Sequence, residues 1–176
     1  MLNEQGMTGA VSPSMRSWCA YVAGEIEAIA GRPELAERHY VRAVDLGRTS
    51  GATFLVGVAT VGLLTVRAAA GHVDDALRGY REVIDYFART GNWTHLWTTL
   101  RNLADLLRTL GDDEPAALLV AAAEHAPDAP AAVPPPPLAR GTSVLHRTEV
   151  LDVARQAIER NLHGAVANDS SPTHAV

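Results

Sequence analysis

Apolar and polar positions along the chain follow a helical rhythm that glycine interrupts every twenty residues. Gly31, Gly71 and Gly111 lie forty residues apart, and Gly51 and Gly91 lie twenty residues after the first two. An alanine follows five residues after each glycine of the forty-residue series, and a tyrosine or valine follows after nine. These residues are Ala36, Ala76 and Ala116, and Tyr40, Tyr80 and Val120. A fixed period of this kind predicts a repeat in which each unit is one pair of helices.

The residues around each glycine indicate where helices end and begin. Glycine adopts the left-handed conformation that closes many helices, and the stretches "RPEL", "HVDDAL" and "DDEPAAL" follow three of the glycines. Proline and acidic side chains suit the first turn of a helix. We therefore predict helices over residues 14–30, 33–49, 53–70, 73–90, 93–110 and 113–126.

The most apolar stretch of the chain is "GATFLVGVATVGLLTVR", which carries no charge before Arg67. A membrane-spanning helix needs about 20 apolar residues, and this run is shorter. In the repeat it is the first helix of the middle unit, with a full unit on either side. A helix that is apolar all round is expected where it is buried all round. We therefore interpret it as a core helix in which Gly57 and Gly62 allow close approach of neighbouring helices, with a membrane-associated protein as the alternative.

A Pro-rich break separates the repeats from one more amphipathic segment. Proline cannot continue a helix, and the run in "PDAPAAVPPPPLARG" favours an extended chain. The segment "TSVLHRTEVLDVARQAIERNL" then predicts a helix that Thr142 or Ser143 would cap. This helix either caps the last unit or mediates a homodimer. We expect an all-α solenoid of three antiparallel helix pairs: a disordered N-terminus (1–13), the repeat domain (14–126), a linker (127–141), the C-terminal helix (142–163) and a disordered tail (164–176).

Composition excludes several classes of function. The net charge is -5 and the pI about 5.8, so the chain lacks the basic surface that binding to DNA phosphates requires. All 15 basic residues are arginine, and without lysine neither a P-loop nor a Schiff-base enzyme can be built. Cys19 is the single cysteine, which precludes an intrachain disulfide and fits a reducing compartment. The N-terminus lacks the pattern of a secretory signal, so we expect a cytoplasmic protein.

Motifs that carry chemistry are missing from the sequence. It contains no GxSxG, HExxH or CxxC, and no two of its seven histidines are spaced i, i+4. Cys19 lies in a predicted helix and is interpreted as a small buried hydrophobe. We therefore predict no catalytic residues, no metal site and no cofactor. A small enzyme with an unrecognised site is the alternative.

The candidate binding residues are Asn92, Trp93, Trp97 and Arg101. The two tryptophans and Arg101 are spaced i, i+4, i+8 and stack along one face of a helix, which Asn92 precedes. Exposed in a groove, such residues would be good anchors for a partner. The alternative is that both rings pack against neighbouring units, with Arg101 over one ring as a cation–π contact. Because Tyr40 and Tyr80 occupy equivalent positions, we interpret both as packing residues.

The helix pairs resemble the tetratricopeptide repeat. Gly24, Gly31, Ala36 and Tyr40 match the family pattern of small residue, turn glycine, alanine and aromatic residue. The chain departs from it in three ways: the proline after the second helix is missing, the period is longer than the usual thirty-four or so residues, and a position where the family often has tryptophan does not carry it. That position is held by Ala20, Thr60 and Leu100. The resemblance implies a long-helix variant of this fold.

The third unit carries a narrower resemblance. The segment "GNWTHLWTTLRNLADLLRTLGDDEPAALLVAAAEHA" is similar to the C-terminal helical array of actinobacterial LuxR-type regulators with a nucleotide-switch ATPase. The residues behind this similarity are Gly91, Asn92, Trp93, Trp97, Leu100 to Ala104, Leu107, Gly111, Ala116 and Ala121 to Glu124. The ATPase and helix-turn-helix motifs of that family do not occur in the chain. The resemblance therefore implies only a sensing or interaction role toward a protein, a peptide or a small effector.

Overall fold

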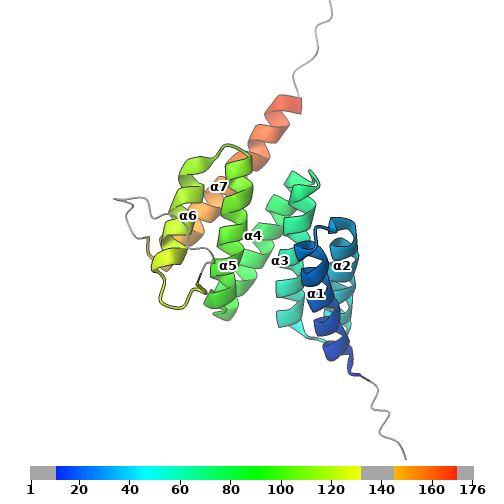
Figure 1. The fold of residues 1–176 in the computed structure, drawn as a ribbon. Helices are drawn as coiled ribbons and strands as arrows, with labels where there is room; N and C mark the ends of the chain where they lie inside the picture. The colour runs from blue at the N-terminus through cyan, green and yellow to red at the C-terminus, as the bar shows by residue number, and fades with distance from the viewer. Residues whose placement is uncertain (1–10, 132–144, 170–176) are drawn as a thin grey trace, which may run out of the picture. The chain divides into compact units, whose positions relative to one another are not determined.

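The computed structural model describes residues 11–131 and 145–169, and it describes side chains as far as His163. Throughout these ranges the regular structure is helical, without a strand (Figure 1). The expected all-α fold is confirmed. The helices are α1 (Pro13–Ile29), α2 (Pro33–Thr49), α3 (Thr53–Ala69), α4 (Val73–Thr90), α5 (Trp93–Thr109), α6 (Asp113–His125) and α7 (Arg147–Asp169). Residues 1–10, which we expect to be disordered, and residues 132–141, which form most of the Pro-rich linker, fall outside the described residues.

Helices α1 to α6 begin and end within one residue of their predicted bounds. The turn glycines explain this agreement, since all five have a positive φ, between 69° and 91°. After α3 the backbone N–H of Gly71 donates to the carbonyl of Ala68, and that of His72 donates to the carbonyl of Arg67. This pair of bonds is the Schellman motif, which satisfies carbonyl groups at a helix end. The same pair recurs at the other four glycines, so five helices end in the same way.

The chain divides into two compact units, residues 1–63 and 64–176, with the division inside α3. In the first unit, α1 and α2 form a helix pair against which the beginning of α3 packs. In the second unit, α5 and α6 form a pair that α4 and α7 accompany. The short turns between successive helices make neighbours antiparallel, as expected for helical hairpins.

The ring of Tyr40 on α2 packs against both other helices of the first unit. Tyr40 is 2% exposed, and its ring lies between Gly24 of α1 and Gly62 of α3. A Cβ atom added to Gly24 or Gly62 would lie 2.7 or 2.5 Å from that ring, so only glycine fits at either position. The Tyr40 hydroxyl donates a hydrogen bond of 2.7 Å to Glu25 Oε1. The close approach expected at Gly62 is therefore confirmed.

The second unit repeats this arrangement forty residues later. Tyr80 is 1% exposed, and its hydroxyl lies 3.0 Å from Thr65 Oγ1, the position equivalent to Glu25. The interpretation of Tyr40 and Tyr80 as packing residues is therefore confirmed. The glycine contact differs between the two units. In the second unit the glycine is Gly79 of α4, and the side chain of Leu64 of α3 packs against its backbone.

The apolar stretch that forms α3 is buried over part of its surface but not all round, contrary to the prediction from its apolar character, because Thr53, Phe54, Thr65 and Ala69 are exposed. Its buried residues are Gly57, Val58, Ala59, Val61, Leu63, Leu64 and Val66. Ala59 packs in a cluster with Ala20, Ala43 and Val44 of the first unit. Within residues 11–131 and 145–169, no helix has the length and apolar character needed to cross a membrane.

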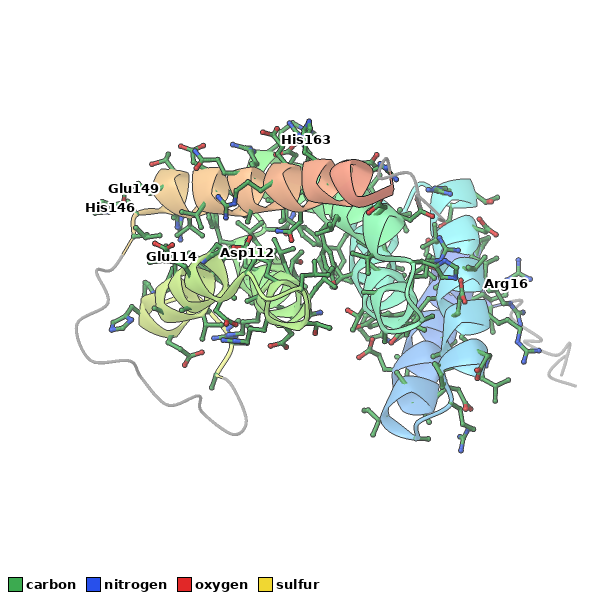
Figure 2. The ribbon with its side chains drawn as sticks, turned by 90° about the horizontal axis from the view of Figure 1, so that it is seen from above. Arg16, Asp112, Glu114, His146, Glu149 and His163 are labelled. Carbon is green, nitrogen blue, oxygen red and sulfur yellow. The ribbon has the colours of Figure 1, made fainter. Side chains whose placement is uncertain are left out.

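Helix α7 is displaced from its predicted position. We predict residues 142–163 from the sequence, but the helix runs over Arg147–Asp169. It is capped by Glu149, whose Oε2 accepts a hydrogen bond of 2.7 Å from the backbone N–H of His146 (Figure 2). Thr142 and Ser143 fall outside the described residues. Of the tail expected to be disordered, residues 164–169 continue the helix, because one glycine costs a helix only about 1 kcal/mol, and residues 170–176 fall outside the described residues.

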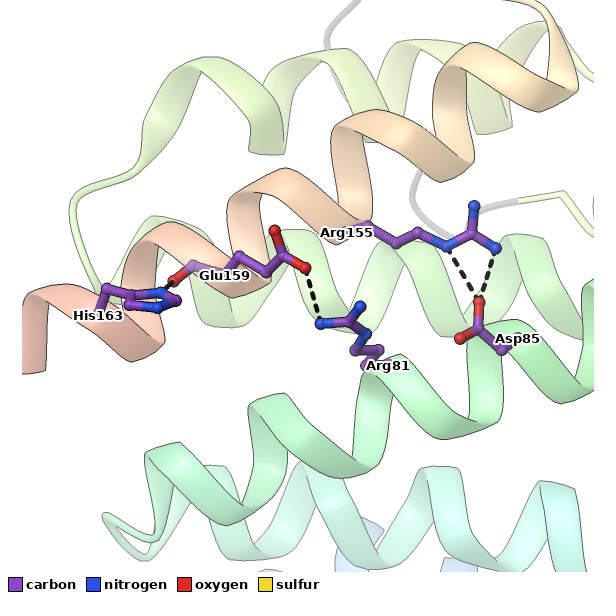
Figure 3. Close-up of polar contacts among 5 residues, drawn as sticks. All are labelled: Arg81, Asp85, Arg155, Glu159 and His163. Atoms are coloured by element: carbon purple, nitrogen blue, oxygen red, sulfur yellow. Dashed lines mark hydrogen bonds and ion pairs between the residues drawn. The ribbon is translucent and has the colours of Figure 1, made fainter.

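The apolar face of α7 packs on α4 and α6 of its own unit. Its buried residues are Val150, Leu151, Ala154, Ala157 and Ile158. Ion pairs join its rim to α4: Arg155 donates two hydrogen bonds to Asp85 Oδ1, and Arg81 donates one of 2.8 Å to Glu159 (Figure 3). Of the two roles weighed for this helix, capping the last unit accounts for its buried face, and dimerisation through it stays a prediction.

We expect Gly71→Ala to lower the free energy of unfolding by about 1–2 kcal/mol, the cost of placing an L-residue in the left-handed region. Nothing lies within 4 Å of a Cβ atom added there, so the loss would come from the backbone alone. Urea denaturation measures it. Gly71→Asn is the matched comparison, because asparagine visits this region more easily, and equal losses for both variants would contradict the explanation.

We also expect stability to fall in alkaline solution, partly through Tyr80. Burial raises the pKa of Tyr80 to about 12, above the value near 10 of an unfolded tyrosine. The folded state therefore holds the proton longer, and its advantage is lost as the pH rises from about 10 to 12. Tyr80→Phe should make the fall shallower, by up to roughly 1.4 kcal/mol per pH unit. Urea denaturation between pH 9 and 12 tests this, with the half-buried Tyr86 as the site of a control Tyr86→Phe and no lysine to complicate the titration.

Candidate functional site

The candidate residues on α5 lie on one side of the helix, as their spacing predicts. We call Trp93, Trp97 and Arg101 the Trp–Arg face. The two indole rings are 5.6 Å apart between centroids and tilted by 42°. Asn92 precedes the helix as its N-cap residue, but its Nδ2 donates a hydrogen bond of 2.7 Å to Thr90 Oγ1. Asn92 therefore belongs to the turn before α5.

The segment that follows α6, residues 126–131, lies against this face; we call it the post-α6 segment. Trp97 is 2% exposed, and its Nε1 donates a hydrogen bond of 2.9 Å to Asp128 Oδ1. The second carboxylate oxygen of Asp128 accepts a hydrogen bond of 2.6 Å from Arg147, the first residue of α7. Partial burial opposes ionisation of this carboxyl, but the Trp97 N–H and the Arg147 charge hold its pKa below the usual value. Asp128 thus joins α5 to the start of α7.

Arg101 holds the same segment through its backbone. One guanidinium nitrogen donates a hydrogen bond of 2.7 Å to the carbonyl of Pro130. The other donates to Glu124 Oε1 at 2.9 Å and to the carbonyl of Ala123 at 3.4 Å, both from α6. The Arg101 Nε is buried and has no hydrogen-bond partner among the described residues. The guanidinium is therefore surrounded by acceptors, and only its Nε lacks a partner in the described part of the chain.

The cation–π contact at this site is made by a different arginine from the one expected. The Arg147 guanidinium lies 4.4 Å from the centroid of a Trp93 ring. Arg101 does not stack on an indole because the Glu124 carboxylate and two backbone carbonyls bind its guanidinium, and charge-assisted hydrogen bonds of this kind are stronger than a partly exposed cation–π contact. Sequence reasoning missed both Asp128 and Arg147. The signal it passed over was a carboxylate between two prolines in a segment read only as a linker.

Cys19 is exposed, which contradicts its interpretation as a buried hydrophobe. The residue lies on α1 beside Trp18, and the side of α1 that packs on α2 carries Ser17 and Ala20 instead. A helical position is buried only where another element covers it, which the apolar character of a neighbour in sequence does not reveal. Among the described residues no group of three or more His, Cys, Asp or Glu side chains is arranged to hold a metal ion.

We expect Asp128→Ala to loosen the post-α6 segment. The change removes the carboxylate that accepts from both Trp97 and Arg147, and hydrogen bonds to a charged group contribute about 1.5–3 kcal/mol each. Amide hydrogen exchange in residues 126–131 should accelerate by roughly tenfold or more. Asp105→Ala on the exposed side of α5 is the control, and exchange that is unchanged in Asp128→Ala would contradict this account.

The Trp–Arg face is thus covered by the post-α6 segment and by Arg147 of the same chain, and binding of a partner to this face stays a prediction. Comparison with models of protein families, with curated proteins and with solved structures finds no match to this chain.

Proposed function

We propose that the chain is a non-enzymatic interaction module whose Trp–Arg face binds an extended, acidic, Pro-containing peptide of a partner protein. The observation that carries this proposal is the way α5 holds the post-α6 segment. Trp97 donates a hydrogen bond to the carboxylate of Asp128, and Arg101 donates one to the backbone carbonyl of Pro130. A bond to the main chain can hold an extended peptide of any sequence, and a bond to a side-chain acceptor adds specificity for an acidic residue.

The composition of the Trp–Arg face supports a binding role. Tryptophan and arginine are the residues most often found at energetic hot spots of interfaces. The Arg101 Nε, which has no partner within residues 11–131 and 145–169, can donate one more hydrogen bond to a ligand with a suitably placed acceptor. A buried donor without a partner costs about 1–3 kcal/mol, so a ligand that satisfied it would gain affinity over the chain's own segment.

The resemblance of residues 91–126 to regulator arrays supports a role in transcriptional control. In this proposal the module senses or recruits a protein partner and leaves nucleotide hydrolysis and DNA binding to other domains or proteins. The post-α6 segment then acts as a competitor in cis, which a partner displaces. An adjacent reading frame that encodes a nucleotide-switch ATPase or a helix-turn-helix domain would support the regulator link.

A peptide binding assay tests the proposal on the full chain. The probe is a fluorescently labelled peptide Ala-Pro-Asp-Ala-Pro-Ala, the sequence of residues 126–131. A tethered segment competes at an effective concentration on the order of millimolar, so wild-type protein should bind the probe weakly. Asp128→Ala should loosen the competitor and increase the affinity about tenfold or more, as measured by fluorescence anisotropy.

Arg101→Ala, added to the Asp128→Ala variant, should reduce probe affinity at least tenfold. The matched control is Arg108→Ala, which removes an exposed arginine of the same helix that pairs with Asp105. Circular dichroism establishes that each variant keeps its helices. A folded Asp128→Ala variant that fails to bind the probe at millimolar concentration would show that the face serves only internal packing.

A further inference from the structure

The carboxylate of Asp128 is bound at both of its oxygens, by donors from two different helices. Oδ1 accepts a hydrogen bond of 2.9 Å from the buried Trp97 Nε1 of α5, and Oδ2 accepts one of 2.6 Å from the Arg147 guanidinium of α7. Because each oxygen faces an N–H group, an amide at this place would turn its NH2 group toward a donor. The two donors together therefore favour an ionised carboxylate.

Arg147 has a second contact that does not involve Asp128. Its guanidinium lies 4.4 Å from the centroid of a Trp93 ring, one turn of α5 before Trp97. A cation–π contact is attractive by itself, so the charge stays over α5 when the carboxylate leaves. The two tryptophans thereby hold a cation and an N–H donor on the same side of the helix.

Helix α7 is attached to the second unit by contacts of its own. Arg155 donates two hydrogen bonds to Asp85 of α4 (Figure 3), and Asn161 donates one of 2.8 Å to Asp112 before α6. The helix also buries an apolar face, made of Val150, Leu151, Ala154, Ala157 and Ile158. None of these contacts involves the post-α6 segment. A ligand that displaces that segment therefore leaves α7, and Arg147 with it, in place.

We infer that Trp97 and Arg147 form the binding site for the acidic side chain of the partner peptide, an inference that rests on the proposed function. In the free chain Asp128 occupies this site, and in the complex an aspartate of the peptide takes its place. Helix α7 is then part of the binding surface, and only the post-α6 segment gives way. The ligand is a peptide with an ionised carboxylate two residues before the carbonyl that Arg101 binds.

Three labelled peptides test the site on the full-length Asp128→Ala variant, from which the internal carboxylate is removed. They are Ala-Pro-Asp-Ala-Pro-Ala and the same sequence with asparagine or lysine in place of aspartate. Fluorescence anisotropy should show that the aspartate peptide binds about tenfold or more tightly than the asparagine peptide, because hydrogen bonds to a charged acceptor are the stronger ones. Equal affinities for these two peptides would overturn the inference.

Arg147→Glu, added to Asp128→Ala, reverses the charge at the site. The ratio of the affinities for the aspartate and lysine peptides should fall by about a hundredfold or more, because like charges replace opposite charges in one complex and the reverse occurs in the other. The matched control is Arg42→Glu, which makes the same change in net charge at an exposed position of α2, in the first unit, and should leave the ratio nearly unchanged. Circular dichroism establishes that each variant is folded, and Arg147→Gln, which only neutralises the charge, should give an intermediate ratio.

Amide hydrogen exchange tests whether α7 stays in place. In the Asp128→Ala variant, amides of residues 150–160 should exchange as slowly with the bound aspartate peptide as without it. Faster exchange on binding would show that α7 leaves together with the post-α6 segment, which would overturn the inference.

The outcomes for Arg101 and Arg147 separate this inference from the proposed function. Failure of the Asp128→Ala variant to bind any of the peptides would defeat both. Binding that Arg101→Ala abolishes and Arg147→Glu leaves unchanged would keep the proposed function and exclude Arg147 from the site. Tighter binding of the aspartate peptide by Arg147→Glu would show that Arg147 obstructs the face, which would also overturn the inference.

Discussion

The constraint on which the rest of the structure depends is the left-handed glycine that ends each of the first five helices. Because these glycines recur every twenty residues, the helices that they close have nearly equal length, and side chains at equivalent positions lie at equivalent heights. Tyr40 and Tyr80 can therefore occupy the same place in successive pairs and find hydrogen-bond partners forty residues apart, at Glu25 and Thr65. The glycine turns therefore fix where each helix begins and ends, and this places equivalent side chains where they can pack.

The two units differ in which residues make the closest contacts between helices. In the first, the large ring of Tyr40 fills the space left by two glycines on flanking helices. In the second, Leu64 takes the position equivalent to Gly24, and the space is found at Gly79 on the opposite helix. In both units a large side chain lies directly against the backbone of a glycine, but the helix that carries the glycine changes. This is the behaviour of a close-packed interior, where shape complementarity matters more than residue identity.

The sequence predicts helices α1 to α6 well because their boundaries depend on local signals, namely the turn glycines and the acidic first turns. It predicts the beginning of α7 less well, because the residue that caps the helix, Glu149, lies inside the segment that the sequence predicts to be helical. The candidate face shows the same division. The alignment of Trp93, Trp97 and Arg101 follows from helical spacing. The contacts of Asp128 and Arg147 join residues that are distant in the chain, and no periodicity encodes them.

The identical turns have a consequence for how such a chain can change in length. A segment cut at two equivalent glycines, such as Gly31 and Gly71, contains one complete helix pair, and joining its ends regenerates the same turn. Duplication or loss of forty residues therefore keeps each junction and the alternation of first and second helices. The helical region is thus modular with a period of forty residues, so it can gain or lose a helix pair without a change in the chemistry of its turns.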